Sequence, residues 1–171
     1  FMAQNEGSHG QLVGQVAGEG AGPIGVVVAN HPDQGPAGGQ RGDAGGKAGG
    51  QRVMDAVLHE DAAFTPYMRQ VPNMPASRDP LTESLDWSTC FLIWGGKETP
   101  VAARCPKTMA ALAGAPLPYI KGSSPDVLFS QLRAGAHILP HTGAVNTRLI
   151  CHVPLIVPPG CHFRVGNETR Q

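Results

Sequence analysis

Apolar and polar positions alternate in short runs over the C-terminal two thirds of the chain, and turn residues separate the runs. Short runs of apolar and β-branched residues bounded by Gly, Pro, Asn or Asp predict strands. Several such strands in succession predict a β-sandwich or a barrel. The predicted strands lie in the segments STCFLIWGG, DVLFSQL, AHILPHTG, TRLICHVPLIV and CHFRVGNETR.

Two segments have the apolar spacing of helices. In QRVMDAVLHEDAAF, residues 51–64, apolar side chains recur at the three- and four-residue intervals of an amphipathic helix. In CPKTMAALAG, Pro106 stands near the first helical position and Gly114 just past the end, which is the usual asymmetry of a helix. The sequence therefore predicts short helices beside a mainly β structure.

Residues 1–50 differ in character from the rest of the chain. They contain 15 of the 23 glycines and a single aromatic residue, Phe1. Such a composition buries too little apolar area to offset the entropy lost on ordering, so we expect a disordered segment or one foreign to the domain at 51–171. The stretch GAGPIG, residues 20–25, matches GxGxxG, but no helical segment follows it, so a dinucleotide site is not expected.

Composition excludes some partners. The formal net charge is +0, which gives no electrostatic argument for binding nucleic acid or an anionic membrane surface. No apolar run approaches the roughly 20 residues of a membrane-spanning helix. The start has no basic and apolar signal pattern, which favours a cytoplasmic location.

The four cysteines contain no CxxC motif and are expected to be free thiols. The oligomeric state is not predictable.

His137 and His141 form an HxxxH pattern with two interpretations. On a helix, both rings would lie on one face and could chelate zinc. Pro140 argues against a helix there, since proline in a helix interior removes a hydrogen bond. On a strand, four residues span about 13 Å, too far for both rings to bind one metal. At most one of the two is then a ligand.

The segment TRLICHVPLIV alternates as a strand, and Arg148 and His152 share one face with Ile150. This face is either a cavity wall that binds an anion or an ordinary core histidine with an arginine at the rim. A non-haem iron site commonly has two histidines and a carboxylate. Thr142 and Gly143 follow His141, so the pattern itself gives no nearby carboxylate.

The segment from Phe129 to Arg170 contains PHTG, NTRL, H-x-PLIVP and GNETR in that order, with LDWSTCFLIWGGKE and CPKT upstream. Together these motifs resemble the aspartyl/asparaginyl β-hydroxylase family of 2-oxoglutarate- and Fe(II)-dependent oxygenases. The resemblance starts near residue 51 and reaches the C-terminus. It implies a mainly β, double-stranded β-helix (jelly-roll, cupin-like) fold with short flanking helices, incomplete at its C-terminal end. The strands of His141 and His152 are then expected in different sheets.

The resemblance also implies roles for single residues. His141, in PHTG, is expected to bind iron, in a family that uses two histidines and no carboxylate, and the second ligand is expected beyond Gln171. Cosubstrate contacts are expected from Trp87, Ser130 and His152, with His137 as a further pocket residue near the metal. The animal enzyme has arginine at the position of Ile150. The candidate substitute on the same strand face is Arg148.

The implied activity is hydroxylation of an unactivated C–H bond, most directly the β-carbon of Asp or Asn in a peptide or protein. Two alternatives stay open: hydroxylation of a lipid acyl chain by the same family, or a non-catalytic β-barrel binding module or inactive fragment. With one predicted iron ligand, the chain by itself is not expected to turn over. The pocket is expected to contain His141 and His152, with His162 outside it.

Overall fold

The computed structural model describes residues 2–3, 13–16, 24–30, 64–70, 75, 79–115, 117, 119–141 and 149–171. The described chain is mainly β, which confirms that part of the predicted fold class. Its strands form two sheets, and all pairings between them are antiparallel. Two antiparallel sheets are compatible with a jelly roll, which stays a prediction.

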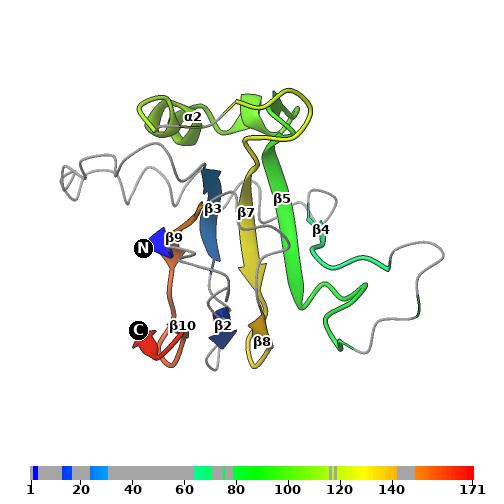
Figure 1. Cartoon of the computed structure of the whole chain (residues 1–171), viewed down its shortest axis with the longest axis vertical. Coiled ribbons are helices and arrows are strands. Elements are labelled where there is room, and N and C mark those ends of the chain that lie inside the picture. The colour runs from blue at the N-terminus through cyan, green and yellow to red at the C-terminus, as the bar shows by residue number, and fades with distance from the viewer. Residues whose placement is uncertain are drawn as a thin grey trace.

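The larger sheet has seven strands, and its centre is formed by long apolar runs. Figure 1 shows three of its strands, β3 (Ile24–Asn30), β7 (Val127–Leu132) and β5 (Trp87–Trp94), side by side below the helix α2 (Pro106–Leu112). The order is β1 (Met2–Ala3), β9 (Leu149–Ile156), β3 (Ile24–Asn30), β7 (Val127–Leu132), β5 (Trp87–Trp94) and β4 (Thr65–Pro66), with β6 (Lys97–Glu98) paired to β5.

The smaller sheet has four strands in the order β11 (Glu168–Arg170), β10 (His162–Val165), β2 (Val13–Val16) and β8 (His137–His141). His141 on β8 and His152 on β9 therefore lie in different sheets, as predicted. The strand at 137–141 also excludes a helical HxxxH site.

Three strands lie within residues 1–50, the segment expected to be disordered or foreign to the domain. β2 pairs with β10 and β8, β3 pairs with β7 and β9, and β1 pairs with β9. β3 has the apolar run IGVVVAN, whose valines favour a strand although the surrounding composition does not. The other residues of 1–50 and residues 51–63 lie outside the described residues, so the domain boundary at 50 stays a prediction.

The predicted helix near residue 106 is present as α2 (Pro106–Leu112), preceded by the 3₁₀ helix η1 (Ala102–Arg104). Pro106 stands at the first helical turn, where its missing N–H costs no hydrogen bond. The helix predicted at 51–64 lies almost wholly outside the described residues.

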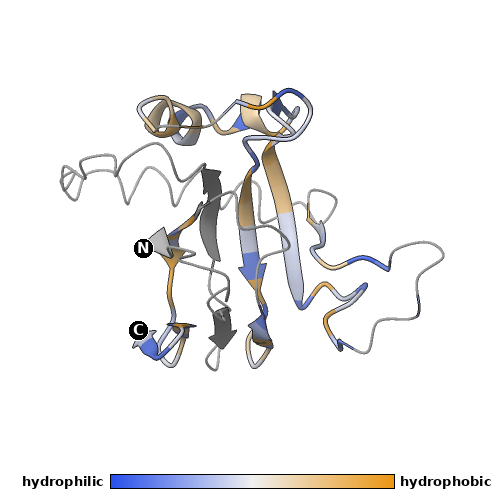
Figure 2. Cartoon of the chain, in the orientation of Figure 1, coloured by the Kyte–Doolittle hydropathy of each residue, from blue (hydrophilic) through white to orange (hydrophobic). Residues whose placement is uncertain are grey.

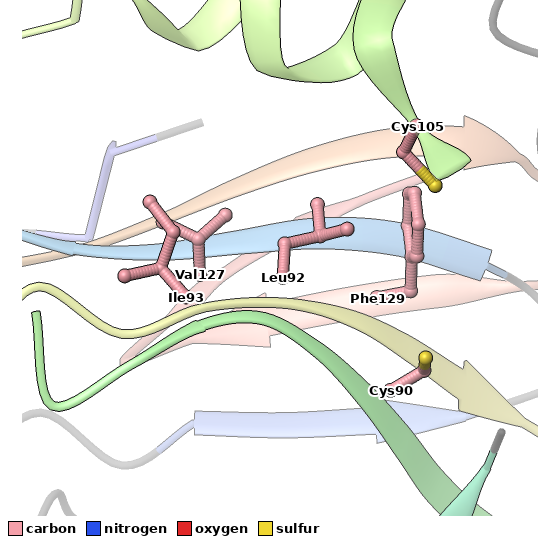
Figure 3. Packing of buried hydrophobic residues seen from close by; sticks show 6 residues of the cluster. All are labelled: Cys90, Leu92, Ile93, Cys105, Val127 and Phe129. Carbon is pink, nitrogen blue, oxygen red and sulfur yellow. The ribbon is translucent and has the colours of Figure 1, made fainter. Parts of the chain in front are cut away.

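The main core lies on β5 and β7 where η1 and α2 cover them. Phe129 is 1% exposed and is surrounded by buried residues of both strands, and Cys105, which directly precedes α2, closes the cluster (Figure 3). Met109 and Leu112 of α2 pack against it from outside. The buried cluster consists of Cys90, Leu92, Ile93, Cys105, Val127 and Phe129.

All four cysteines are free thiols, as predicted. Burial raises the pKa of Cys90 to about 11, and the neighbouring Cys105 adds to the rise. Both thiols are therefore protonated at neutral pH and act as small apolar side chains in the core.

The apolar face of β9 is less buried than its sequence pattern indicates. Cys151 and Ile156 pack against the main core, whereas Val153, Leu155 and Val157 are exposed. Figure 2 shows this apolar character along β9 and on the upper parts of β5 and β7.

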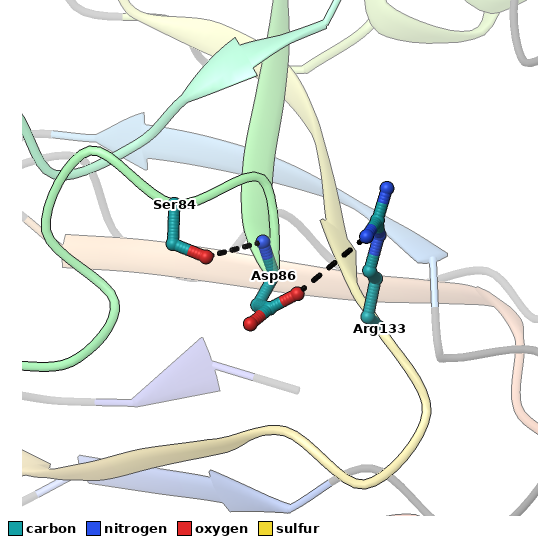
Figure 4. Close-up of polar contacts among 3 residues, drawn as sticks. All are labelled: Ser84, Asp86 and Arg133. Carbon is teal, nitrogen blue, oxygen red and sulfur yellow. Dashed lines mark hydrogen bonds and ion pairs between the residues drawn. The ribbon is translucent and has the colours of Figure 1, made fainter.

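A polar junction fixes the start of β5 against the end of β7. The backbone N–H of Asp86 donates to Ser84 Oγ at 3.0 Å, and Arg133 donates its backbone N–H to the Asp86 carbonyl at 2.8 Å. The Arg133 guanidinium also lies 3.8 Å from the Asp86 carboxylate (Figure 4). This junction sets the position of Trp87, the next residue along the chain.

Replacing Gly96 with alanine is expected to destabilise the protein by roughly 3 kcal/mol or more. Gly96 has φ +79, and an added Cβ would lie 2.6 Å from the carbonyl oxygen of Ser124. Gly166→Ala is the matched control: its φ is +55 but nothing lies within 4 Å of the added Cβ. We expect about 1–2 kcal/mol there, from backbone strain alone. Urea denaturation measures both, and equal losses would show that the contact with Ser124 is unimportant.

Candidate cofactor pocket

The indole of Trp87 and the hydroxyl of Ser130 meet between neighbouring strands. Trp87 pairs with Leu132 on β7, so Ser130, two residues away, is its diagonal neighbour on the same face of the sheet. Trp87 Nε1–H donates to Ser130 Oγ at 3.2 Å. Because the oxygen accepts this bond, the hydroxyl hydrogen of Ser130 is left to donate to another group.

His141 reaches the same place from the smaller sheet. It is the last residue of β8, and its ring centroid lies 5.9 Å from that of Trp87. Its Nδ1 lies 2.9 Å from the carbonyl oxygen of Leu139. A carbonyl oxygen only accepts, so Nδ1 carries the hydrogen and Nε2 keeps a lone pair. An imidazole oriented in this way is suited to bind a metal through Nε2.

His152 approaches from β9 and is partly buried. Burial lowers its pKa to about 4, and a further lowering comes from the nearby His141. His152 is therefore neutral at neutral pH. Its ring packs against Phe163 of β10, with centroids 4.7 Å apart.

The structure thus brings three of the predicted site residues together from three strands: Trp87 is hydrogen-bonded to Ser130, and its ring lies beside that of His141. His152, on a fourth strand, is close enough to His141 for that ring to affect its pKa. The described residues contain no group of three or more His, Cys, Asp or Glu side chains that could hold a metal. Within that part of the chain, His141 supplies a suitably oriented donor nitrogen, but these residues do not complete a metal site.

The other predicted residues have different outcomes. His137 lies at the opposite end of β8 from His141 and is exposed, so its place in the pocket stays a prediction. Arg148 lies outside the described residues. His162 neighbours Phe163, and the alternation along a strand places these two side chains on opposite faces of β10. Since Phe163 faces His152, His162 points away from the pocket.

Two aromatic residues of the pocket were not predicted from the sequence. Tyr67 stacks on Trp87 with ring centroids 4.1 Å apart, and Phe163 packs on His152. For Phe163 the signal was its alternation with His162 and Arg164 on a predicted strand. Tyr67 lies in a proline-rich connection, and no local pattern marks it.

Lowering the pH is expected to destabilise the protein through His152. Its pKa is about 4 in the folded chain against an ordinary 6.5, so the unfolded chain binds the additional proton between these values. Stability is therefore lost as the pH falls through 6.5 towards 4, by at most about 2 kcal/mol between pH 7.5 and pH 5. Urea denaturation of wild type and His152→Gln at both pH values isolates this contribution, with His162→Gln as the control. An unchanged pH dependence in His152→Gln would contradict the assignment.

These features define a mainly β protein in which aromatic, hydroxyl and imidazole groups from two sheets lie close together. The family model described as aspartyl/asparaginyl beta-hydroxylase matches residues 53–171. The chain belongs to this family, as its motifs indicated.

Curated relatives agree with the family match. The chain is 37% identical over 99 residues to mouse aspartyl/asparaginyl beta-hydroxylase, covering 53% of this chain and 12% of the relative. The human protein of that name is 35% identical over 94 residues, again 53% and 12% of the two lengths. Human aspartate beta-hydroxylase domain-containing protein 2 is 33% identical over 88 residues, or 51% of this chain and 24% of the relative. The chain thus spans a small part of these relatives.

No solved structure matches the chain significantly. None of the helices in the described ranges combines the length and the hydropathy needed to cross a membrane.

Proposed function

We propose that this chain carries part of the active site of a 2-oxoglutarate- and Fe(II)-dependent dioxygenase. The observation that supports this best is the contact of Trp87 with both Ser130 and His141, with His152 near His141. These residues are far apart in sequence, and each was expected at such a site from the family motifs. The parent protein is then expected to hydroxylate the β-carbon of Asp or Asn in a peptide or protein, in line with the names of its relatives.

The geometry of His141 supports its role as an iron ligand. Its Nδ1–H donates a hydrogen bond to the Leu139 carbonyl oxygen, so Nε2 is the nitrogen that would bind the ion. The second histidine ligand is proposed beyond Gln171, on the family resemblance. Fe(II), when bound, would supply oxygen activation coupled to conversion of 2-oxoglutarate into succinate and carbon dioxide. With one ligand among the described residues, we assign no step of that chemistry to this chain alone.

The remaining pocket residues are suited to hold 2-oxoglutarate. The Ser130 hydroxyl, already accepting from Trp87, has its own hydrogen to donate to a carboxylate. His152 is neutral at neutral pH, and the family resemblance assigns its imidazole to the same carboxylate. Arg148 is proposed to add a positive charge near the same carboxylate of 2-oxoglutarate, because Ile150 stands where the animal enzyme has an arginine. His137 is proposed as a further residue of the cofactor site.

A lipid acyl chain is the alternative substrate within the family. A non-catalytic β-barrel module is the alternative outside it. The module would bind its ligand without any requirement for iron, which separates it from the dioxygenase. The described residues place a hydroxyl and an imidazole beside the Trp87 ring, which fits a small dicarboxylate better than a purely apolar ligand.

Replacing Ser130 with alanine is expected to weaken 2-oxoglutarate binding about tenfold, because a hydroxyl donor to a carboxylate is lost. His152→Ala is expected to weaken it by a similar factor. Ser123→Ala, in an exposed turn, is the matched control and should bind as wild type does. Titration calorimetry with 2-oxoglutarate at pH 7 measures all four proteins. Wild-type affinity in Ser130→Ala would contradict the proposed pocket.

A further inference from the structure

The part of the chain that matches the family leaves a gap one strand wide in each sheet. Its strands β7 and β9 do not pair with each other but both pair with β3. Likewise, β8 and β10 both pair with β2. The family match begins at residue 53, whereas β2 and β3 end at Val16 and Asn30. Both central strands therefore come from outside the matched region.

Each gap offers two rows of backbone hydrogen-bonding groups to whatever strand enters it. β3 pairs over Ile24–Val28 with β7 and over Ile24–Asn30 with β9. Without an occupant, β7 and β9 would each have an unpaired edge inside the sheet, and β8 and β10 would have the same in the other sheet. Unpaired edges of this kind bind added strands through main-chain hydrogen bonds.

The occupants also lie directly beside the pocket. In the register of the sheets, Val13 is opposite His141, Gly25 is opposite Ser130 and Val27 is opposite His152. The sequences VGQV and IGVVVAN contain no His, Cys, Asp or Glu. Residues 13–16 and 24–30 therefore complete both sheets without placing a metal-ligating side-chain type at these positions.

We propose that the family-matched region is a strand acceptor, and that residues 13–30 fill its two gaps in cis as a replaceable strand pair. Both gaps take an extended segment, and in the larger sheet that segment, IGVVVAN, is mainly apolar and β-branched. Another segment with a histidine or a carboxylate at the register position of Val13 would bring a second ligand next to His141. That consequence rests on the proposed function, whereas the strand exchange itself does not.

The test weakens one occupant in the full chain and supplies it again as a peptide. Val27→Pro removes a backbone donor from β3 and disfavours pairing in a central strand. Val27→Thr keeps the N–H and the β-branched side chain and is the matched control. We expect amides of β7 and β9 to exchange at least about tenfold faster in Val27→Pro than in wild type, and Val27→Thr to behave as wild type.

A peptide of residues 22–32 in excess should then restore slow exchange in β7 and β9 of Val27→Pro, while a scrambled peptide should not. If Val27→Pro unfolds altogether, recovery of the fold with the peptide supports the proposal equally. Unchanged exchange in Val27→Pro would show that β3 does not fill the gap. Loss of protection that the peptide fails to restore would show that the gap does not accept an exchangeable strand. None of these readouts depends on iron or 2-oxoglutarate, so they are independent of the proposed activity.

Discussion

Replacing Phe129 with alanine is expected to lower the free energy of unfolding by about 3–5 kcal/mol. Its side chain is 1% exposed and lies in the main core between Cys90, Leu92 and Cys105. Removing the ring loses its transfer free energy and leaves a cavity, since β5 and β7 are held in register and cannot close around it. Urea denaturation followed by circular dichroism measures the loss.

Phe91→Ala provides the matched control for this change. Phe91 is only partly buried, and its ring packs on the exposed Trp94 with centroids 4.3 Å apart. We expect a loss of about 1 kcal/mol there, because little apolar area returns to water. A loss at Phe129 no larger than that at Phe91 would contradict the location of the main core.

Replacing His141 with alanine is expected to weaken metal binding and, in the parent protein that carries the second predicted ligand, to lower 2-oxoglutarate turnover at least about 100-fold. The reason is that a single imidazole cannot replace a chelating pair of histidines. Even a change to a residue that only supports a metal ligand typically lowers metal affinity or activity about 10–100-fold. In this chain alone we expect weak binding, which His141→Ala weakens further. Mn(II) binding, followed by the disappearance of the free-ion electron paramagnetic resonance signal, measures both proteins.

His137→Ala is the control for His141→Ala. It removes an exposed imidazole from the other end of the same strand and should leave metal affinity nearly unchanged. Equal losses in the two variants would indicate non-specific binding by surface histidines. Retention of wild-type metal affinity in His141→Ala would show that the ligand assignment is wrong.

Much of the fold was predictable because the relevant patterns are local. The apolar runs at 87–94, 127–132 and 149–156 are strands, and Pro106 marks the start of the predicted short helix. The placement of His141 and His152 in different sheets followed from the family resemblance. Their proximity arises only through tertiary structure, which no spacing in the sequence encodes.

The strands of residues 1–50 were not predictable by the same reasoning. A glycine-rich composition predicts disorder on average, but IGVVVAN is a strand because unpaired edges of β7 and β9 accept it. Strand propensity depends on such neighbours more than helix propensity does. For the same reason Tyr67 could not be assigned to the pocket, since its stacking on Trp87 depends on the pairing of β4 with β5.

The low pKa of His152 also lay beyond the sequence. The alternation along β9 predicts which face of the strand carries His152. The pKa of His152, however, depends on its burial and on the nearby His141 of the other sheet. The burial of the apolar face of the same strand was overestimated, because no described element covers Val153 and Leu155.

The proposal of a 2-oxoglutarate-dependent dioxygenase is tested most directly by succinate formation. The parent protein is incubated with 2-oxoglutarate and an Asp- or Asn-containing peptide, with Fe(II) or with a chelator, and succinate is quantified. We expect succinate and hydroxylated peptide in equal amounts with Fe(II), and neither with the chelator. Succinate formation that persists without Fe(II), or its absence with Fe(II) and a bound 2-oxoglutarate, would show that the proposed activity is wrong.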